Sequence, residues 1–317
     1  MKKILFLLFI LFSNIISAQL HWKNVDSAHQ PLPQGTHVFF TNDSLDGKPN
    51  IAYYFIAGIK NKNLFFTSDA KNGTRLTPSQ YFEKDEKPLL VVNCTFFEFV
   101  HNSNLNLVVK DGNVLANSIQ TIAGKGKDTL TYRHVFKSAI GINKHAKADV
   151  AWIFSDSVKH FAYASQQAVY SFKDSSAYYS FQQIPSTIKS KFSKWKVKTA
   201  VGGGPVLLQN GQIKISNEEE QMFTGKAIND KHPRTAMGYT NDGKIIVLVI
   251  QGRFPAKAEG ATLLQEAKLL QDLGCTEALN LDGGGSSCML INGKQTIQPS
   301  DKEGQRPVPA VFVIKQK

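Results

Sequence analysis

The pattern of apolar and polar positions along the chain predicts many strands and few helices. Four pairs of strand-like stretches are separated by the turn dipeptides Asp111-Gly112, Asn210-Gly211, Asp242-Gly243 and Asn292-Gly293. Such dipeptides supply the positive φ angles that two-residue hairpin turns require, and strand-forming residues flank each of them. We therefore expect four β-hairpins within an extended, mostly antiparallel sheet.

One stretch predicts a helix between two buried strands. Residues 244–250 are apolar on both faces, and residues 277–281 form a second apolar run. Between them, residues 261–274 carry leucines at helical spacing, with Glu266 and Lys268 expected to face solvent. This order predicts a βαβ unit with parallel strands and a right-handed crossover. The expected fold is α/β in the mixed α+β sense: a large twisted, mostly antiparallel sheet with hairpins, one βαβ unit and few flanking helices.

The rest of the chain indicates one domain behind a leader sequence. Residues 155–198 have weak periodicity and are expected to form loops with a short helix after Pro185. No Pro-, Gly- or Ser-rich linker divides the chain, which favours a single domain over residues 19–317. The first 18 residues combine two lysines, a short apolar core and Ala18, which predicts a cleaved secretory signal peptide. We therefore expect a periplasmic or extracellular protein with no stable membrane anchor after cleavage.

The net charge limits the kinds of binding partner, and the cysteine content limits the kinds of disulfide or metal site. The formal net charge of +12 suits an anionic partner, such as an envelope polymer or a phosphorylated glycan, although a solvated basic surface without a partner is the simpler explanation. The lysines are scattered rather than blocked, so nucleic-acid binding has no support. Cys94, Cys275 and Cys288 are too few for a disulfide framework or a zinc site. Buried thiols are favoured, and pairing of Cys275 with Cys288 is left open.

The first candidate site is the Asp-Gly-Gly-Gly-Ser-Ser stretch that begins at Asp282. The predicted βαβ unit places Asp282 just beyond the carboxyl end of its strand, where open α/β sheets bind ligands. The stretch lacks the ending of a nucleotide P-loop. A turn needs fewer than three glycines, whereas a backbone that meets an anion benefits from them. We therefore favour a ligand site over a turn that Asp282 merely caps.

Three other stretches carry candidate chemistry. Residues 201–206 (VGGGPV) contain a second glycine cluster. In residues 231–238, Arg234 is a candidate for bidentate contact with a phosphate or carboxylate, and Thr235 adds a hydroxyl; a surface salt bridge is the alternative for Arg234. Asn93 and Glu98 interrupt an apolar run, and Glu98 is a possible second carboxylate.

Together these motifs, in this order, resemble the phosphodiester glycosidase family. The stretches are NCTFF, GGGP, HPRTAMG, the helix with LLQEAKLLQDLG, LNLDGGGSS and a final RPVPAVFVI, and they extend from about residue 89 to the end of the sequence. The sequence departs from the family pattern at two places. Cys94 and Thr95 stand where relatives often have two glycines, and Gln251 stands where many have aspartate.

The resemblance implies an active cleft lined by these motifs. The expected catalytic residues are Asp282, Arg234, Asn93 and Glu98. The expected substrate and phosphate contacts are Gly203, Gly204, Thr235, Arg253, Gly283, Gly284, Gly285 and Ser286. No cofactor and no metal site is expected, and a divalent cation near Asp282 is left open because no cluster of ligands is visible.

The resemblance also implies a function: hydrolysis, by an exported enzyme, of a sugar-1-phosphodiester such as an N-acetylglucosamine-1-phosphodiester in envelope polysaccharide or glycan metabolism. A phosphate monoester leaves as a weak base, so the general acid usual in glycosidases is less needed. Arg234 and glycine N–H groups suit the phosphate, and Asp282 suits a cationic sugar or a water. The alternatives are a glycan- or exopolysaccharide-binding protein without turnover, and a phosphodiesterase that cleaves the P–O bond.

Overall fold

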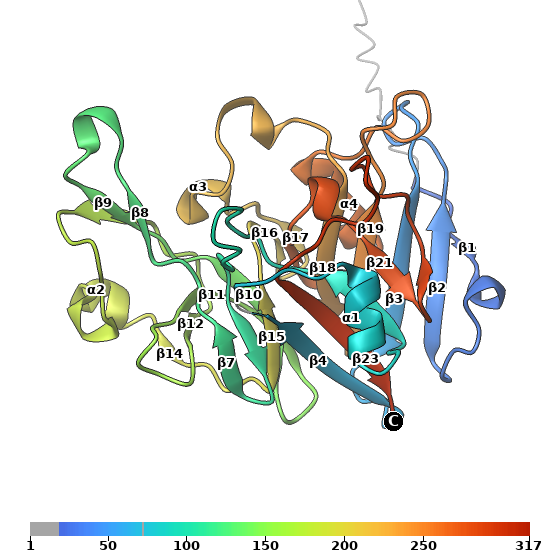
Figure 1. Cartoon of the computed structure of the whole chain (residues 1–317), viewed down its shortest axis with the longest axis horizontal. Coiled ribbons are helices and arrows are strands. Elements are labelled where there is room, and N and C mark those ends of the chain that lie inside the picture. The colour runs from blue at the N-terminus through green and yellow to red at the C-terminus, as the bar shows by residue number, and fades with distance from the viewer. Residues whose placement is uncertain (1–18, 72) are drawn as a thin grey trace, which may run out of the picture.

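The computed structural model describes residues 19–71 and 73–317, and it consists mainly of antiparallel sheets (Figure 1). The predicted signal peptide, residues 1–18, lies outside the described residues. The largest sheet has eight strands, in the spatial order β1 (Lys23–Asn24), β2 (Thr36–Thr41), β3 (Ala52–Gly58), β19 (Lys244–Ile250), β18 (Arg234–Thr240), β20 (Cys275–Asn280), β16 (Val206–Gln209) and β17 (Gln212–Ile213).

Three further sheets complete the strand framework. A seven-stranded sheet has the order β14 (Ser193–Lys194), β12 (Tyr163–Ser165), β11 (Ala148–Phe154), β10 (Ser138–Ile142), β15 (Thr199–Gly202), β6 (Val108–Lys110) and β7 (Asn113–Ala116). A five-stranded sheet has the order β22 (Lys294–Gln295), β21 (Met289–Ile291), β5 (Leu90–Asn93), β23 (Ala310–Gln316) and β4 (Leu64–Ala70). A three-stranded sheet has the order β13 (Phe172–Asp174), β9 (Tyr132–His134) and β8 (Thr121–Ala123).

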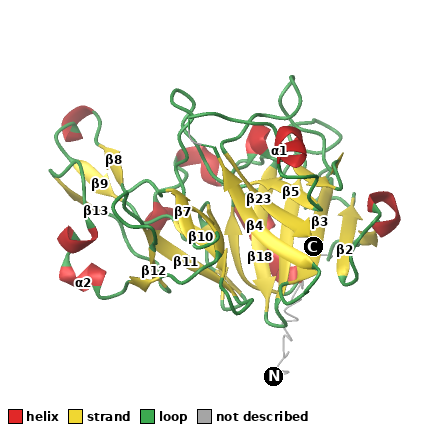
Figure 2. Ribbon diagram, turned by 60° about the horizontal axis from the view of Figure 1, so that its bottom comes forward, coloured by secondary structure: helices red, strands yellow, loops and turns green. Residues whose placement is uncertain are grey.

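Helices are short and lie around the sheets, as Figure 2 shows. The α-helices are α1 (Pro78–Lys84), α2 (Ser186–Lys189), α3 (Asn217–Glu220) and α4 (Leu263–Asp272), and the short 3-10 turns are η1 (Asp26–His29), η2 (Gly126–Asp128), η3 (Phe181–Gln183), η4 (Gly225–Ile228) and η5 (Gly284–Ser286). The predicted sheet-dominated α+β class is confirmed, although the strands form several sheets rather than one. Within residues 19–71 and 73–317, every helix is too short or too polar to cross a bilayer.

All four predicted hairpins are present. The dipeptides at 111–112, 210–211, 242–243 and 292–293 join β6 to β7, β16 to β17, β18 to β19 and β21 to β22. Both turn residues have positive φ in three of them, and only Gly243 does so in the fourth. Residues 155–198 are expected from the sequence to form loops and a short helix after Pro185. The short helix α2 is present, but the region also contains strands β12, β13 and β14.

The predicted βαβ unit is present: two parallel strands are joined by a helix, and a third strand lies between them. Strands β19 and β20 both pair antiparallel with β18, which lies between them, so β19 and β20 run parallel. Helix α4 packs on one face of this sheet, mainly over β16 and β20, and its Leu263 and Leu270 share one apolar cluster with Ile246 and Leu248 of β19. The alternate residues of β19, such as Val247, face the main core on the other side. This two-sided burial explains why β19 is apolar throughout.

The main core lies between the three larger sheets. It contains Phe55 and Val247 from the eight-stranded sheet, Phe312 from the five-stranded sheet, and Ile140 and Trp152 from the seven-stranded sheet. All five side chains are almost completely buried. Burial of such large apolar side chains is the main stabilising contribution, at about 1.5–3 kcal/mol for each.

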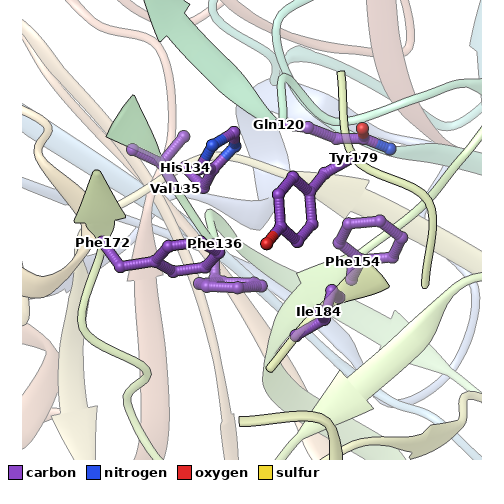
Figure 3. Close-up of a pocket in the computed structure, with 8 residues that line it drawn as sticks. All are labelled: Gln120, His134, Val135, Phe136, Phe154, Phe172, Tyr179 and Ile184. Carbon is purple, nitrogen blue, oxygen red and sulfur yellow. The ribbon is translucent and has the colours of Figure 1, made fainter. Parts of the chain in front are cut away.

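The three-stranded sheet is held at one side by an aromatic cluster, drawn in Figure 3. The ring of His134 lies 4.5 Å from that of Tyr179 and 4.8 Å from that of Phe172, measured between centroids. His134 Nε2 also lies 2.9 Å from the Asp174 carboxylate. These contacts join β9 to β13 and to the segment before η3.

Candidate active site

Asp282 lies where the eight-stranded and five-stranded sheets meet. It follows the end of β20, as the sequence predicts. Its backbone N–H donates to the carbonyl of Cys94 at 2.8 Å, and the Asn93 side-chain amide donates to the Asp282 carbonyl at 2.5 Å. Asn93 is the last residue of β5. Two different sheets therefore hold the Asp282 backbone in place.

Asn93 and Thr235 belong to a buried polar network beneath this point. The Thr235 hydroxyl donates to Asn93 Oδ1 at 2.9 Å and lies 3.2 Å from the Ser287 hydroxyl oxygen. The backbone N–H of Cys288 also donates to Asn93 Oδ1. Asn93 and Thr235 are completely buried, so their contacts favour a role in positioning Asp282. A direct catalytic or phosphate-binding role for these two residues stays a prediction.

Each of the three glycines after Asp282 permits a close approach by a different neighbour. A Cβ atom on Gly283 would lie 2.6 Å from the Pro233 carbonyl oxygen, and one on Gly284 would lie 2.9 Å from Arg253 Nη2. A Cβ on Gly285 would collide with Arg306 and its ion-pair partner. Gly284 also has a φ of +61°, which favours glycine. Packing thus accounts for the triple glycine.

Most of the loop's N–H groups are used inside the protein. Gly284 donates to the Pro233 carbonyl, while Ser286 and Ser287 donate to the carbonyls of Gly283 and Gly284. The Gly283 N–H interacts with the Asp282 carboxylate. Substrate contact through Gly283, Gly284, Gly285 or Ser286 stays a prediction. The internal hydrogen bonds leave few N–H groups of the loop free to bind a substrate.

The Asp282 carboxyl group is protonated more easily than an ordinary aspartate. Burial raises the pKa of Asp282 to about 7, and the Ser286 hydroxyl, the Arg306 charge, the Gly283 N–H and the Arg253 charge partly offset this effect. The residue as a whole is half-buried. A carboxyl with a pKa near neutrality suits proton transfer or electrostatic work in a site.

Two arginines lie beside the glycine loop. Arg306 forms a two-pronged ion pair with Asp301, with N–O distances of 2.7 and 2.9 Å. Arg253 is exposed, and its guanidinium makes no hydrogen bond or ion pair with another described residue. Arg306 was not among the predicted site residues, although it stands in the RPVPAVFVI motif. Arg253 is the guanidinium best placed to meet an anion next to Asp282.

Arg234 is buried beneath the site rather than open to it. It is 3 % exposed, and it donates to the carbonyls of Ala261 at 2.8 Å and Asp230 at 3.1 Å. Its neighbour Glu266 on α4 is fully buried, so the prediction that Glu266 faces solvent is wrong. Burial raises the pKa of Glu266 to about 8, and the charge of Arg234 opposes that shift. These contacts favour a positioning role for Arg234, and phosphate binding by its side chain stays a prediction.

The second glycine cluster is also packed against the protein. A Cβ on Gly203 would collide with the Asn280 carbonyl, and one on Gly204 with the Glu220 carboxylate. Glu220 is fully buried and accepts four hydrogen bonds, two of them from Ser138. The sequence prediction missed Glu220, whose signal is weak because it stands in an acidic run on a short helix. Substrate binding by Gly203 and Gly204 stays a prediction.

Comparison with known families decides the identity. The model of the phosphodiester glycosidase family matches residues 86–315, well over half of the sequence. The chain belongs to the phosphodiester glycosidase family. The match contains Asn93, Arg234, Asp282 and their surrounding motifs, so the family resemblance predicted from those motifs is confirmed.

Relatives with known names match over shorter stretches. The SPbeta prophage-derived uncharacterized protein YomE of Bacillus subtilis is 38 % identical over 81 residues, which cover 26 % of this chain and 12 % of that protein. The N-acetylglucosamine-1-phosphodiester alpha-N-acetylglucosaminidase of mouse is 33 % identical over 103 residues, which cover 30 % of this chain and 20 % of the mouse protein. The chain thus matches no more than a fifth of the length of these two relatives.

Solved structures share the fold over most of the chain. The zebrafish N-acetylglucosamine-1-phosphodiester alpha-N-acetylglucosaminidase catalytic domain, auto-inhibited by its pro-peptide, superposes with a TM-score of 0.61 at 19 % identity, covering 95 % of this chain and 89 % of that one. A putative exported protein of Burkholderia pseudomallei superposes with a TM-score of 0.55 at 16 % identity, covering 87 % and 75 % of the two chains.

Glu98, the possible second carboxylate, and Gln251, one of the departures from the family pattern, both make local contacts. Glu98 accepts hydrogen bonds from the backbone N–H groups of Val100 and His101, which lower the pKa of its carboxyl group. Its carboxylate therefore stabilises its own loop, and a catalytic role stays a prediction. Gln251 is buried, and its side-chain oxygen accepts from the Gln298 N–H. An amide satisfies this partner without placing a second negative charge beneath the site.

The described residues contain no group of three or more histidine, cysteine, aspartate or glutamate side chains arranged to hold a metal ion. Cys94, Cys275 and Cys288 are buried, free thiols in the structure. Binding of a divalent cation near Asp282 stays an open prediction.

Replacing Arg234 with lysine is expected to lower the melting temperature by several degrees as well as turnover. Sequence reasoning alone predicts a loss of turnover at unchanged stability, but the buried guanidinium donates to two separate carbonyls, and a lysine cannot reproduce that fork. Thermal unfolding of this variant, next to the exposed-site control Lys268→Arg, provides the measurement. An unchanged melting temperature would contradict the positioning role.

Proposed function

We propose that this protein is an exported phosphodiester glycosidase that hydrolyses a sugar-1-phosphodiester, such as an N-acetylglucosamine-1-phosphodiester, in envelope polysaccharide or glycan metabolism. The observation that carries the proposal is the Asp282 carboxyl, with its pKa near 7, beside the charges of Arg253 and Arg306. Membership of the family gives this arrangement its chemistry.

Arg253 holds the phosphate of the substrate in this proposal. Arg253 is exposed, and its guanidinium lies against Gly284. Gly284 is the second residue after Asp282. Arg306 contributes positive potential but is partly neutralised by Asp301. A guanidinium can bind phosphate oxygens through two parallel hydrogen bonds, which fixes orientation as well as charge.

Asp282 acts at the sugar. Cleavage of the bond between the anomeric carbon and oxygen leaves positive charge on the ring, and an ionised Asp282 stabilises that charge or accepts a proton from the attacking water. The departing phosphate monoester is a weak base, so a separate general acid is not required. This matches a site in which Glu98 is committed to its own loop.

The proposed location outside the cytoplasm rests on two observations. The first 18 residues have the composition of a secretory leader. One of the structural neighbours is described as a putative exported protein. The chemistry at Asp282 does not depend on this assignment.

Hydrolysis in oxygen-18 water tests the proposed reaction. We expect the purified protein to release the sugar from an N-acetylglucosamine-1-phosphodiester, with the label in the sugar, because water attacks the anomeric carbon. Label in the phosphate would show P–O cleavage and establish a phosphodiesterase instead. Tight binding of the same compound without turnover would overturn the proposal in favour of a glycan-binding protein.

A further inference from the structure

Lysine side chains gather around two adjoining cavities at one end of the sheets. The cavities measure about 260 and 490 Å3 and share Asn143, Lys144 and Lys198 in their walls. The β3–β4, β6–β7 and β10–β11 turns, the segment before β15 and Lys317 form them. We call this feature the lysine groove and define it by Lys60, Lys62, Lys144, Lys196 and Lys198.

The ammonium groups of the lysine groove are not neutralised. None of the five makes an ion pair or a side-chain hydrogen bond with another described residue, and the side chain of Lys198 only lies 4.8 Å from the ring of Phe65. Asp111 is the acidic side chain in the walls. By contrast, Lys84 and Lys110 elsewhere both pair with Asp69. A concave surface with charges of one sign concentrates counter-ions of the opposite sign.

The lysine groove is distinct from the candidate active site. In the five-stranded sheet, Val311 of β23 pairs with Asn93 beside Asp282, whereas Gln316 of β23 pairs with Leu64 at the groove. Five residue steps along the strand lead from Val311 to Gln316, a distance of about 17 Å at about 3.4 Å per step. In Figure 1 the groove end of β23 is marked by the C-terminus at the bottom.

We propose that the lysine groove binds an anionic polysaccharide chain. Lysine supplies compact point charges that suit repeated carboxylates or phosphates without demanding one geometry. The Asn143 side-chain amide makes no donor hydrogen bond to a described residue, so its N–H groups are open to sugar hydroxyls. Ala146 and Phe65 give a partly exposed apolar floor for a sugar ring. The two cavities together fall within the range of about 300–1,000 Å3 that is typical of ligand sites.

The groove is less suited to the other polyanions. Binding of single-stranded nucleic acid relies on several aromatic rings on which successive bases stack, whereas the described residues that line the two cavities offer Phe65 alone as a partly exposed phenylalanine, tyrosine or tryptophan ring. A membrane surface would need exposed apolar side chains. The large apolar side chains that the described residues expose, such as Phe99 and Leu264, do not line either cavity.

Fluorescence anisotropy with a labelled oligogalacturonate tests the inference. We expect the oligogalacturonate to bind more tightly than a neutral dextran oligomer of equal length, with an affinity that falls as salt rises. The triple variant Lys62→Gln, Lys144→Gln, Lys198→Gln should bind at least about tenfold more weakly. The matched triple Lys23→Gln, Lys127→Gln, Lys268→Gln removes the same charge from exposed lysines outside the groove and should change affinity less than about twofold.

Three outcomes would overturn the inference. Equal losses in the two triple variants would mean that net charge alone attracts the polymer. Equal affinity for an oligonucleotide of the same charge would mean a general polyanion surface, and equal affinity for dextran would mean no charge recognition. The triple groove variant should still hydrolyse a small sugar-phosphodiester, because the groove lysines lie away from Asp282. This measurement separates failure of the groove proposal from failure of the proposed function.

Discussion

Asp282→Asn is expected to lower turnover by about two orders of magnitude or more, the range for losing one electrostatic or general-base contribution. The variant should remain folded, because the backbone contacts of Asp282 with Cys94 and Asn93 do not involve its carboxylate. If Asp282 merely caps the turn, asparagine would preserve activity, since it caps nearly as well. Turnover and thermal unfolding of this variant distinguish the two roles. Asp242→Asn, at the opposite end of β18 from Arg234, is the matched control.

The same substitution has a predictable effect on stability with pH. The pKa of Asp282 is about 7 in the folded protein, against its ordinary value of 3.8, so the unfolded chain loses this proton at lower pH. Stability therefore declines as pH rises from about 4 to about 7, and the asparagine variant lacks this decline. We expect the melting temperature of the variant, relative to the original protein, to be higher at pH 8 than at pH 4. A constant difference across that range would contradict a buried, raised-pKa carboxyl.

Glu266→Gln is expected to raise the free energy of unfolding above pH 8, by on the order of a few kcal/mol. Glu266 has a pKa of about 8 in the folded protein against an ordinary value of 4.5, so the protein loses stability as pH rises through this interval. Glutamine keeps the shape and cannot ionise, which removes the loss. Denaturant unfolding at pH 5 and pH 9 is the measurement, with the exposed Glu83→Gln as control. Parallel pH profiles for Glu266→Gln and the original protein would contradict the buried position.

Local sequence was sufficient for much of the fold and for the place of Asp282. Asn-Gly and Asp-Gly turns depend on the conformations of their own two residues, so the four hairpins could be read directly. The order of strand, helix and strand likewise placed Asp282 just beyond β20. The face of Glu266 could also have been read. It stands three residues after Leu263 and four before Leu270, on the apolar side of α4.

The roles of the arginines could not be read in this way. Arg234 stands in the most recognisable motif, yet its guanidinium is buried against backbone carbonyls. Arg253 and Arg306 reach the glycine loop from segments that are distant in the sequence. Sequence shows which side chains are charged, but whether a charge meets solvent, a carbonyl or a substrate depends on packing between separate segments.

By itself, then, the sequence determined the sheet-dominated class, the hairpins and the position of Asp282, because each depends on residues close together in the chain, and it determined the family through the order of several short motifs. Only the tertiary structure decided why the glycines are required, which guanidinium groups lie beside Asp282, and that Glu266 is buried. Those features arise where the eight-stranded sheet meets the five-stranded sheet on one side and α4 on the other. Burial shifts the pKa values of Asp282 and Glu266 there, and burial is a property of the assembled fold rather than of any local stretch.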